Sequence, residues 1–496
     1  MSRCLPGFSK NGLLLAIVAL GVTACSGSSP ESRTASAPLA SPSAPPRPAS
    51  DPLASATPSD AGTIASSAPN AAAAGLTFLK DDLEGALARA KKEKKALFVD
   101  AWAGWCHTCL SMQNYVFVDP SLKPLEERIV FLAIDTERDE NAKFLERYAV
   151  NVWPTLFMIE PVSGKVAGYW PGSASLAELR SFLTGSLEVI DALGKSSLSA
   201  DSPLALLVEA KAATARGDHK AAATLYERAL ARAPADWPRR SEALFGLIQS
   251  LARTGKAEKC VSVGLDRQKD VVGSALPVDF VATMFECTEG IRDRARQRAA
   301  RVVALERLSE LTAHPPADAS IDDRSDALDK LSEVRLALGD PRGAREAQEQ
   351  RLALMEAAAR AAATPEAAQT YDYGRANAYL ALGRPEEAIR MLEERERQLP
   401  ESYDPPGRLA RVLSRLKRWE PALAAVDRAL KNAYGPRRLG YLELKADIQH
   451  ARHDSPGELQ TLEELVAGHQ ALSAGQANKQ GLQAAQKRLA AARAGR

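Results

Sequence analysis

The order of apolar and polar positions divides the chain into four stretches. A single apolar run, Leu13 to Val22, lies near the N-terminus, and residues 26–75 carry almost no large apolar side chain. From about residue 76 to 190, short apolar runs alternate with segments of helical spacing, and from about residue 200 to 496 only helical spacing remains. The pattern predicts an α/β domain at 76–190 followed by an all-α part at 200–496.

Buried strands are predicted in the α/β part where a short apolar run is bounded by polar or turn residues. Such runs cover residues 96–102, 129–135 and 150–159, and Gly164 marks a hairpin into 165–170. Amphipathic spacing predicts helices at 81–95, 110–116, 140–148 and 176–187.

Small residues recur at a fixed spacing in the helical part. Ala410 and Ala422 stand 34 positions after Ala376 and Ala388. Further copies are marked by glycines between expected helices, at Gly217, Gly255, Gly339 and Gly383. This arrangement resembles the tetratricopeptide repeat, which implies stacked helix pairs that form a superhelix with a concave face. Residues 260–325 and 437–496 fit the repeat poorly, and a non-repetitive helical bundle is the alternative.

Length and charge add two limits. A chain of 496 residues has room for about two or three folded units. Its 64 Lys and Arg residues nearly balance 62 Asp and Glu residues, so no overall field draws it to nucleic acid or to an anionic bilayer. We expect no nucleic-acid partner.

The N-terminus has the pattern of a signal peptide, which we assign to residues 1–24. Basic residues precede the apolar run, and the run is too short to span a bilayer comfortably. The run ends in Val22-Thr23-Ala24-Cys25, which resembles the lipobox of bacterial lipoproteins and implies that Cys25 becomes a lipidated first residue. An ordinary signal peptide with an incidental cysteine is the alternative.

The lipobox resemblance has consequences for location. Ser26 follows the cysteine, and in enterobacterial lipoproteins this implies sorting to the outer membrane, so we expect a lipid-anchored protein of the cell envelope that faces the periplasm. From Cys25 to residue 75 the chain is rich in Ser, Ala and Pro and has almost no large apolar residue, so it cannot bury enough apolar surface to fold. We expect a disordered tether with a span of roughly 40 Å.

The candidate chemistry lies in Cys106-His107-Thr108-Cys109, between the strand at 96–102 and the helix at 110–116. An apolar strand, a tryptophan, this CxxC motif and a helix together resemble the active site of the thioredoxin superfamily. Disulfide exchange needs a thiolate, and a helix N-terminus lowers the pKa of a cysteine thiol there. Cys106 is therefore the expected nucleophile, and Cys109, one turn later, is the expected resolving thiol.

The same resemblance assigns roles to residues outside the motif. Pro154 stands where the superfamily has a cis-proline beside the active site, and Asp100 where it has a buried acid that accepts a proton from the second cysteine. Without the resemblance, Asp100 could equally be a charge at the edge of a strand. The residues expected to line the substrate site are Trp105, Trp153 and Thr155.

Within the superfamily, the domain resembles the C-terminal periplasmic domain of the DsbD family. The likeness rests on the run from Cys109 to Pro120 and on the long insertion before the second strand. His107-Thr108 and Leu110 depart from the family pattern beside the thiols, so the direction of electron flow stays open. Membrane-spanning electron-relay segments are absent from the sequence, and a reductase of this kind would need an upstream redox partner.

Two further questions concern the cysteines. A CxxC motif can be half of a zinc site, but the sequence holds no second CxxC and no suitably spaced histidine pair, so we expect no metal and no cofactor. Cys260 and Cys287 fall in neighbouring expected helices, where either a structural disulfide or two buried free thiols fits an oxidising compartment.

These observations predict a thioredoxin fold followed by a tetratricopeptide-like superhelix. We interpret the chain as an extracytoplasmic thiol–disulfide oxidoreductase that acts on cysteines of envelope proteins and recruits partners through the repeats. The alternative is a scaffold lipoprotein for envelope assembly with a non-catalytic thioredoxin-like domain. Intact Cys106, Cys109 and Asp100 favour the enzyme.

Overall fold

A computed structural model describes residues 75–194 and 199–494, all within one compact unit. The expected signal peptide, Cys25 and nearly all of the expected tether lie outside the described residues. Over the described ranges, no helix has the length and apolar content needed to cross a bilayer.

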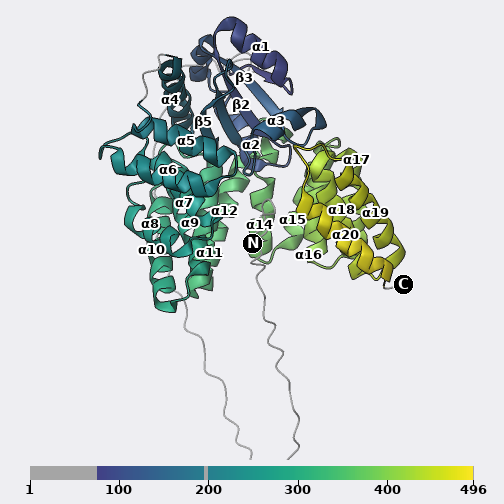
Figure 1. The fold of residues 1–496 in the computed structure, drawn as a ribbon. Helices are drawn as coiled ribbons and strands as arrows, with labels where there is room; N and C mark the ends of the chain where they lie inside the picture. The colour runs from purple at the N-terminus through teal and green to yellow at the C-terminus, as the bar shows by residue number, and fades with distance from the viewer. Residues whose placement is uncertain (1–74, 195–198, 495–496) are drawn as a thin grey trace, which may run out of the picture. The chain divides into compact units, whose positions relative to one another are not determined.

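The α/β part is built on a five-stranded mixed sheet with the strand order β1-β3-β2-β4-β5 (Figure 1). Its strands are β1 (Phe78–Lys80), β2 (Ala96–Trp102), β3 (Ile129–Asp135), β4 (Thr155–Ile159) and β5 (Val166–Pro171). β1 and β2 run parallel to β3, β4 runs antiparallel to β2, and β5 runs antiparallel to β4. β2 is therefore central, and the chain leaves it directly into the CxxC motif.

One strand prediction needs correction, and one strand was not predicted. The strand predicted at 150–159 begins only at Thr155, because Val150–Pro154 bends through a cis peptide bond between Trp153 and Pro154 and Pro154 has no N–H for a strand ladder. β1 was not predicted, because three residues are too few to show an alternating pattern.

Helices cover both faces of the sheet. Alternate side chains of β2 point to opposite faces, so Leu97 and Val99 pack with helices α1 (Leu83–Glu93) and α3 (Ala142–Arg147). Phe98 packs on the other face with Met112 and with helix α4 (Leu176–Gly194), which continues beyond its predicted end. The helix after the motif is α2 (His107–Ser111), continued by a π-helical turn at Met112–Val116. Shorter 3-10 segments lie at Pro120–Glu127 and Asp139–Asn141.

The remaining described residues are helical and pair along the chain (Figure 1). The helices of the first half are α5 (Pro203–Ala215), α6 (His219–Arg232), α7 (Arg240–Arg253), α8 (Ala257–Arg267), α9 (Leu276–Cys287), α10 (Arg294–Ala313), α11 (Ile321–Leu338) and α12 (Pro341–Ala361). Those of the second half are α13 (Pro365–Gln369), α14 (Asp372–Ala381), α15 (Pro385–Gln398), α16 (Asp404–Arg415), α17 (Trp419–Asn432), α18 (Gly435–Ala451), α19 (Ser455–Ala471) and α20 (Lys479–Ala494). A 3-10 turn at Thr288–Gly290 follows α9. We call α5 to α20 the helical array.

The turn within each helix pair explains the glycine pattern. The residue that closes the turn has a positive φ, which glycine adopts without strain, and the values are +77° at Gly217 and +73° at Gly383. Lys417 takes the same conformation between α16 and α17. The alanines 34 positions apart are buried at matching places, Ala388 in α15 and Ala422 in α17. The predicted helical repeat is confirmed.

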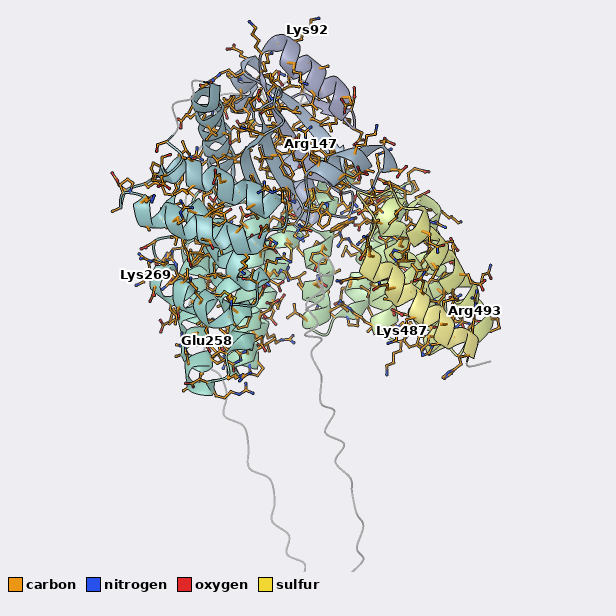
Figure 2. All side chains as sticks on the ribbon, in the orientation of Figure 1. Lys92, Arg147, Glu258, Lys269, Lys487 and Arg493 are labelled. Atoms are coloured by element: carbon orange, nitrogen blue, oxygen red, sulfur yellow. A yellow bond between two sulfur atoms is a disulfide. The ribbon has the colours of Figure 1, made fainter. Side chains whose placement is uncertain are left out.

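The α/β part and the array share one hydrophobic core. Leu179 and Phe182 of α4 belong to the same buried cluster as Phe245 and Leu247 of α7. Charged side chains project from the surface, as Figure 2 shows for Lys92 in the α/β part and for Lys269 and Lys487 in the array. Since the core is continuous, array helices pack directly against the part of the chain that carries the CxxC motif.

Candidate active site

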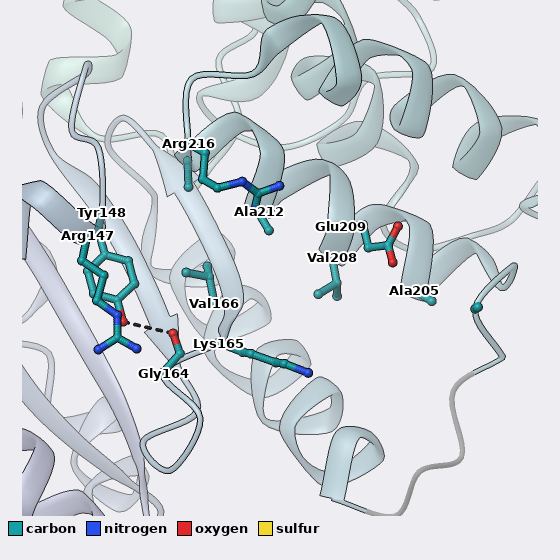
Figure 3. Close-up of a pocket in the computed structure, with 12 residues that line it drawn as sticks. Arg147, Tyr148, Gly164, Lys165, Val166, Ala205, Val208, Glu209, Ala212 and Arg216 are labelled. Carbon is teal, nitrogen blue, oxygen red and sulfur yellow. Dashed lines mark hydrogen bonds between the residues drawn. The ribbon is translucent and has the colours of Figure 1, made fainter.

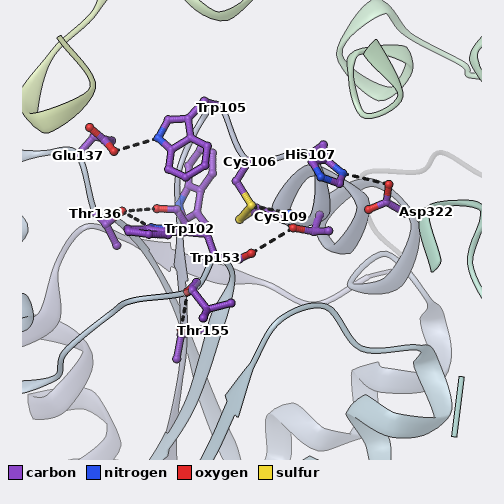
Figure 4. Close-up of a disulfide and its surroundings, with 12 residues drawn as sticks. Trp102, Trp105, Cys106, His107, Cys109, Thr136, Glu137, Trp153, Thr155 and Asp322 are labelled. Carbon is purple, nitrogen blue, oxygen red and sulfur yellow. Dashed lines mark hydrogen bonds and ion pairs between the residues drawn. A yellow bond between two sulfur atoms is a disulfide. The ribbon is translucent and has the colours of Figure 1, made fainter. Parts of the chain in front are cut away.

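The two motif cysteines are bonded to each other at the start of α2. Cys106 is the N-cap residue of the helix and forms a disulfide with Cys109 (Figure 4). The backbone N–H of Cys109 donates a hydrogen bond of 3.0 Å to the sulfur of Cys106. In the reduced protein, this N–H and the helix dipole favour a thiolate at Cys106. The geometry thus allows Cys106 to act as the attacking thiol.

Both sulfurs are deeply placed. Cys106 is only 3% exposed and Cys109 is fully buried. Ala103 and the partly buried rings of Trp102, Trp105 and Trp153 pack around them. Another molecule could therefore reach the sulfur of Cys106 only where these side chains move apart.

The cis-proline corner lies beside the disulfide. The hydroxyl of Thr108 donates a hydrogen bond of 3.1 Å to the carbonyl of Trp153, which joins the motif to the cis peptide bond before Pro154. Thr155 was expected to contact substrate, but its side chain is fully buried and its hydroxyl donates to the carbonyl of Val152 at 2.6 Å. The Thr155 side chain therefore supports the corner from inside.

The two tryptophans expected at the substrate site lie against each other, with ring centroids 5.3 Å apart. The indole N–H of Trp153 donates to the hydroxyl of Thr136 at 2.8 Å, and that of Trp105 donates to Glu137 at 2.9 Å. Both indole N–H groups are satisfied, so the rings are held in place as an apolar wall (Figure 4).

Asp100 lies in the central strand β2 and is 1% exposed. Burial raises its pKa to about 7, and a hydrogen bond from Gln113 opposes the rise. Its Oδ1 has no hydrogen-bond partner among the described residues. Gln113 stands four positions after Cys109, about one helical turn along, so its hydrogen bond joins Asp100 to the helical segment that carries Cys109. A carboxyl group with this pKa can exchange protons near neutral pH.

The array supplies several residues of the site that the sequence did not reveal. Arg408 of α16 donates a hydrogen bond of 2.8 Å to the carbonyl of Trp105. The guanidinium of Arg437 in α18 lies 4.8 Å from the centre of the Trp105 ring, and its backbone N–H donates to Glu137. His107, between the two cysteines, is held by Asp322 of α11 and stacks on Tyr373 of α14.

These array residues are distant in sequence from the motif. The contacts of His107 with Asp322 and of Arg408 with Trp105 span 215 and 303 positions. No local pattern marks such residues, because their role depends on contacts with segments that are distant in the sequence. Gln113 is different, since its position one turn after Cys109 was readable from the sequence.

The other cysteine pair lies within the array. Cys260 of α8 and Cys287 at the end of α9 form a disulfide, and Cys260 is fully buried. Across residues 75–194 and 199–494, no group of three or more His, Cys, Asp or Glu side chains is arranged to hold a metal ion.

Among the pockets that the described residues form next to the α/β part, two larger ones do not contain the motif cysteines. One, of about 520 Å³, lies between α5 and the β4–β5 hairpin, where the hydroxyl of Tyr148 donates to the carbonyl of Gly164 at 3.1 Å (Figure 3). The other, of about 610 Å³, lies between residues 137–140 and helices α18 and α19, and Glu137 and Tyr434 line it. Because Glu137 also holds Trp105, this second pocket adjoins the wall of the disulfide site.

Comparison with known families agrees with both parts of the fold. Residues 78–161 match the family model described as Thioredoxin-like, and residues 379–447 match the model for the tetratricopeptide repeat. The first match includes the motif cysteines and the cis-proline corner.

Curated relatives match the α/β part. The thiol:disulfide interchange protein DsbD of Pseudoalteromonas atlantica is 29% identical over 110 residues, which is 21% of this chain and 19% of that protein. DsbD of Colwellia psychrerythraea is 31% identical over 81 residues, 16% of this chain and 13% of that protein. The chain thus covers less than a fifth of the length of these two relatives.

Solved structures of tetratricopeptide repeat proteins resemble part of this chain. A tetratricopeptide repeat protein from Parabacteroides merdae has 13% identity and a TM-score of 0.36, over 57% of this chain and 96% of that chain. A thermophilic tetratricopeptide repeat protein from Thermus thermophilus has 24% identity and a TM-score of 0.29, over 43% of this chain and 100% of that chain. The family models and the fold together show that this chain carries a thioredoxin-like domain resembling part of DsbD, followed by tetratricopeptide repeats.

Proposed function

We propose that the protein is a thiol–disulfide oxidoreductase that acts on cysteines of other proteins in the cell envelope. The observation that carries the proposal is the Cys106–Cys109 pair at a helix N-terminus, with the sulfur of Cys106 accepting a hydrogen bond from the N–H of Cys109. A purely structural disulfide has no need of this position, whereas an attacking thiolate is stabilised by it.

The exchange needs no cofactor, because the two thiols of the motif supply the electron pair that reduces the client disulfide. The Cys106 thiolate attacks a client disulfide, one client sulfur leaves as a thiolate, and a mixed disulfide forms. Asp100 accepts the proton of Cys109, whose thiolate then attacks the sulfur of Cys106. The second client sulfur leaves as a thiolate and takes up the proton that Asp100 accepted, so the client is reduced and the Cys106–Cys109 disulfide re-forms. The same steps in reverse oxidise a client dithiol, and we expect neither metal nor cofactor in either direction.

The proposal includes partners and a location. The relatives named thiol:disulfide interchange proteins support exchange with protein thiols, and tetratricopeptide repeats suit the binding of protein segments. We expect a dithiol protein upstream to supply electrons if the domain is a reductase. We also propose a lipid anchor at Cys25, with the outer membrane favoured and the domain facing the periplasm.

Trapping with single cysteine variants tests the enzyme. Cys109→Ser should accumulate mixed disulfides with envelope proteins, because the thiol that breaks them is gone, whereas Cys106→Ser should form few and the double variant none. The measurement is a non-reducing gel of cells that express each variant, with mass spectrometry of the trapped species. Equal adducts from both single variants would mean that the attacking thiol is assigned wrongly.

One observation favours the scaffold alternative. Cys106 is only 3% exposed beneath the tryptophans and the array, as expected for a disulfide that has a structural role and does not exchange with other proteins. The same trapping experiment separates the two functions, because a scaffold forms no adducts through either cysteine. In that case the function lies in the binding of partner proteins by the repeats.

A further inference from the structure

The residue after the nucleophile is held by the array. His107 is the first residue of α2 and its side chain is 22% exposed. Its Nδ1 lies 3.1 Å from Oδ1 of Asp322, the second residue of α11, and Asp322 is itself only 4% exposed. The imidazole also stacks on Tyr373 of α14, with ring centroids 4.9 Å apart and planes 16° from parallel.

The charged groups around this imidazole have opposing effects. Burial lowers the pKa of His107, but the charge and hydrogen bond of Asp322, together with the charge of Asp326, outweigh it, and the pKa lies above its usual value. Arg408 opposes this rise, while its guanidinium lies over the ring of Tyr373. The Asp322 carboxylate therefore favours the imidazolium form of His107.

We propose that Asp322 is a positioning residue of the disulfide site, which acts through His107 by holding its imidazole as a cation beside Cys106, so that the disulfide is more readily reduced. This inference rests on the proposed function and assigns part of the redox control to the repeat array. His107 is adjacent to Cys106 in the chain, and Figure 4 shows its imidazole between the disulfide and Asp322.

The direction of the effect follows from charge. Reduction converts an uncharged disulfide into a thiol and a thiolate, and a cation beside Cys106 stabilises the thiolate. His107 directly follows Cys106 in the chain, and the Asp322 carboxylate contacts the imidazole of His107. We therefore expect the attraction between the imidazolium and the thiolate to exceed the repulsion from Asp322. A stabilised reduced form gives a less negative reduction potential.

The experiment measures the equilibrium between the full chain and glutathione. Two glutathione thiols become one glutathione disulfide, and the electron pair reduces the Cys106–Cys109 bond to two thiols. The probe is a series of glutathione redox buffers at pH 7, with the state of the motif cysteines read by alkylation and mass spectrometry. Asp322→Asn should lower the equilibrium constant for reduction about tenfold, which is a potential about 30 mV more negative.

A matched control separates charge from docking. Asp318→Asn removes the charge from another contact between the array and the α/β part, and so weakens it, without touching His107; in this contact the Ser175 hydroxyl donates a hydrogen bond of 3.0 Å to Asp318. Its potential should equal that of the wild type. If Asp318→Asn shifts the potential as much as Asp322→Asn, the effect comes from loosened packing and the proposal is wrong.

A second variant tests the route through histidine. In a His107→Asn background, Asp322→Asn should no longer lower the potential, because no imidazole remains to be charged. The wild type and Asp322→Asn should also converge in potential as the pH rises above the pKa of His107. The pH at which the two potentials converge depends on all the charged groups that act on the imidazole, namely Asp322, Asp326 and Arg408.

The outcomes distinguish this inference from the proposed function. Equal potentials for wild type and Asp322→Asn reject the inference, whatever the trapping experiment shows. A less negative potential in Asp322→Asn also rejects it, because it would mean that the carboxylate acts directly on the thiolate. Absence of trapped adducts rejects the enzyme, while the glutathione equilibrium still reports whether Asp322 acts on the disulfide.

Discussion

Arg408 donates a hydrogen bond of 2.8 Å to the backbone carbonyl of Trp105, the residue immediately before the candidate nucleophile. Its Nε donates to Asp404 of the same helix at 2.5 Å, so one planar guanidinium joins α16 to the wall of the disulfide site. This fork requires arginine, since the single ammonium group of lysine does not reproduce its geometry.

Arg408→Lys should make reduced Cys106 easier to reach. The lysine keeps a charge near Asp404 but loses the bond to Trp105, which is worth about 1 kcal/mol, or about fivefold in the population of an opened site. The measurement is the alkylation rate of Cys106 in the reduced full-length protein, followed by mass spectrometry. Arg428→Lys is the control, because Arg428 pairs with Glu396 on the array surface, far from the motif in sequence. An unchanged rate in Arg408→Lys would show that this contact does not limit access.

The redox motif and its neighbouring strands were predictable because their signals are local. The strand at Ile129–Asp135 was predicted with its bounds, since a buried strand in a parallel ladder is apolar at nearly every position. The start of β4 was misplaced, because the apolar pattern continues through Val150–Val152 although the cis bond at Pro154 prevents a strand there.

The array's part in the site was not predictable from the sequence. Asp322 lies in α11 and Tyr373 in α14, and only the tertiary fold brings these two residues to His107 of α2. The sequence did indicate a helical repeat, because buried small residues recur at a constant spacing. It carried no sign of which face of the repeat meets the α/β part.

Replacing both Cys260 and Cys287 by serine should destabilise the array. The disulfide closes a loop with a sequence separation of 27, and a cross-link of this length stabilises a fold by about 3.5 kcal/mol through the unfolded state. The measurement is thermal unfolding of the full chain, in which the variant should melt at a lower temperature. The potential of the Cys106–Cys109 pair should stay unchanged. A wild-type melting temperature would mean that the bond adds no stability.

The lipid anchor remains a prediction from the sequence. Cys25→Ser should prevent lipidation, so the protein should leave the detergent phase in a partition experiment. Cys4→Ser is the matched control, because Cys4 lies in the segment expected to be removed. If Cys25→Ser partitions like the wild type, the expected anchor is wrong, while the redox proposal is unaffected.

Asp100→Asn should change how stability depends on pH. In the folded protein burial raises the pKa of Asp100 to about 7, above the ordinary value of about 4 in an unfolded chain. Between these values the folded state binds more protons, so the wild type loses stability as the pH rises, by about 1.4 kcal/mol per unit within the window. Asparagine removes this contribution. The measurement is unfolding by guanidinium at pH 5 and pH 8. The free energy of unfolding of the variant, relative to that of the wild type, should be higher at pH 8 than at pH 5.

Asp100→Asn should also slow one step of the exchange more than the other. The attack by Cys106 depends on the helix N-terminus and the N–H of Cys109, which the variant leaves intact. Resolution requires Cys109 to lose its proton, and Asp100 is the buried acid whose pKa suits it to accept that proton. We expect about a tenfold or greater loss in the rate of mixed-disulfide breakdown, with the rate of formation nearly unchanged. Stopped-flow mixing with a small fluorescent disulfide separates the two rates. Gln113→Glu cannot replace Asp100→Asn in this test, because it would add a charge beside Asp100. Equal slowing of both steps would assign Asp100 to the folding of β2 and not to proton transfer.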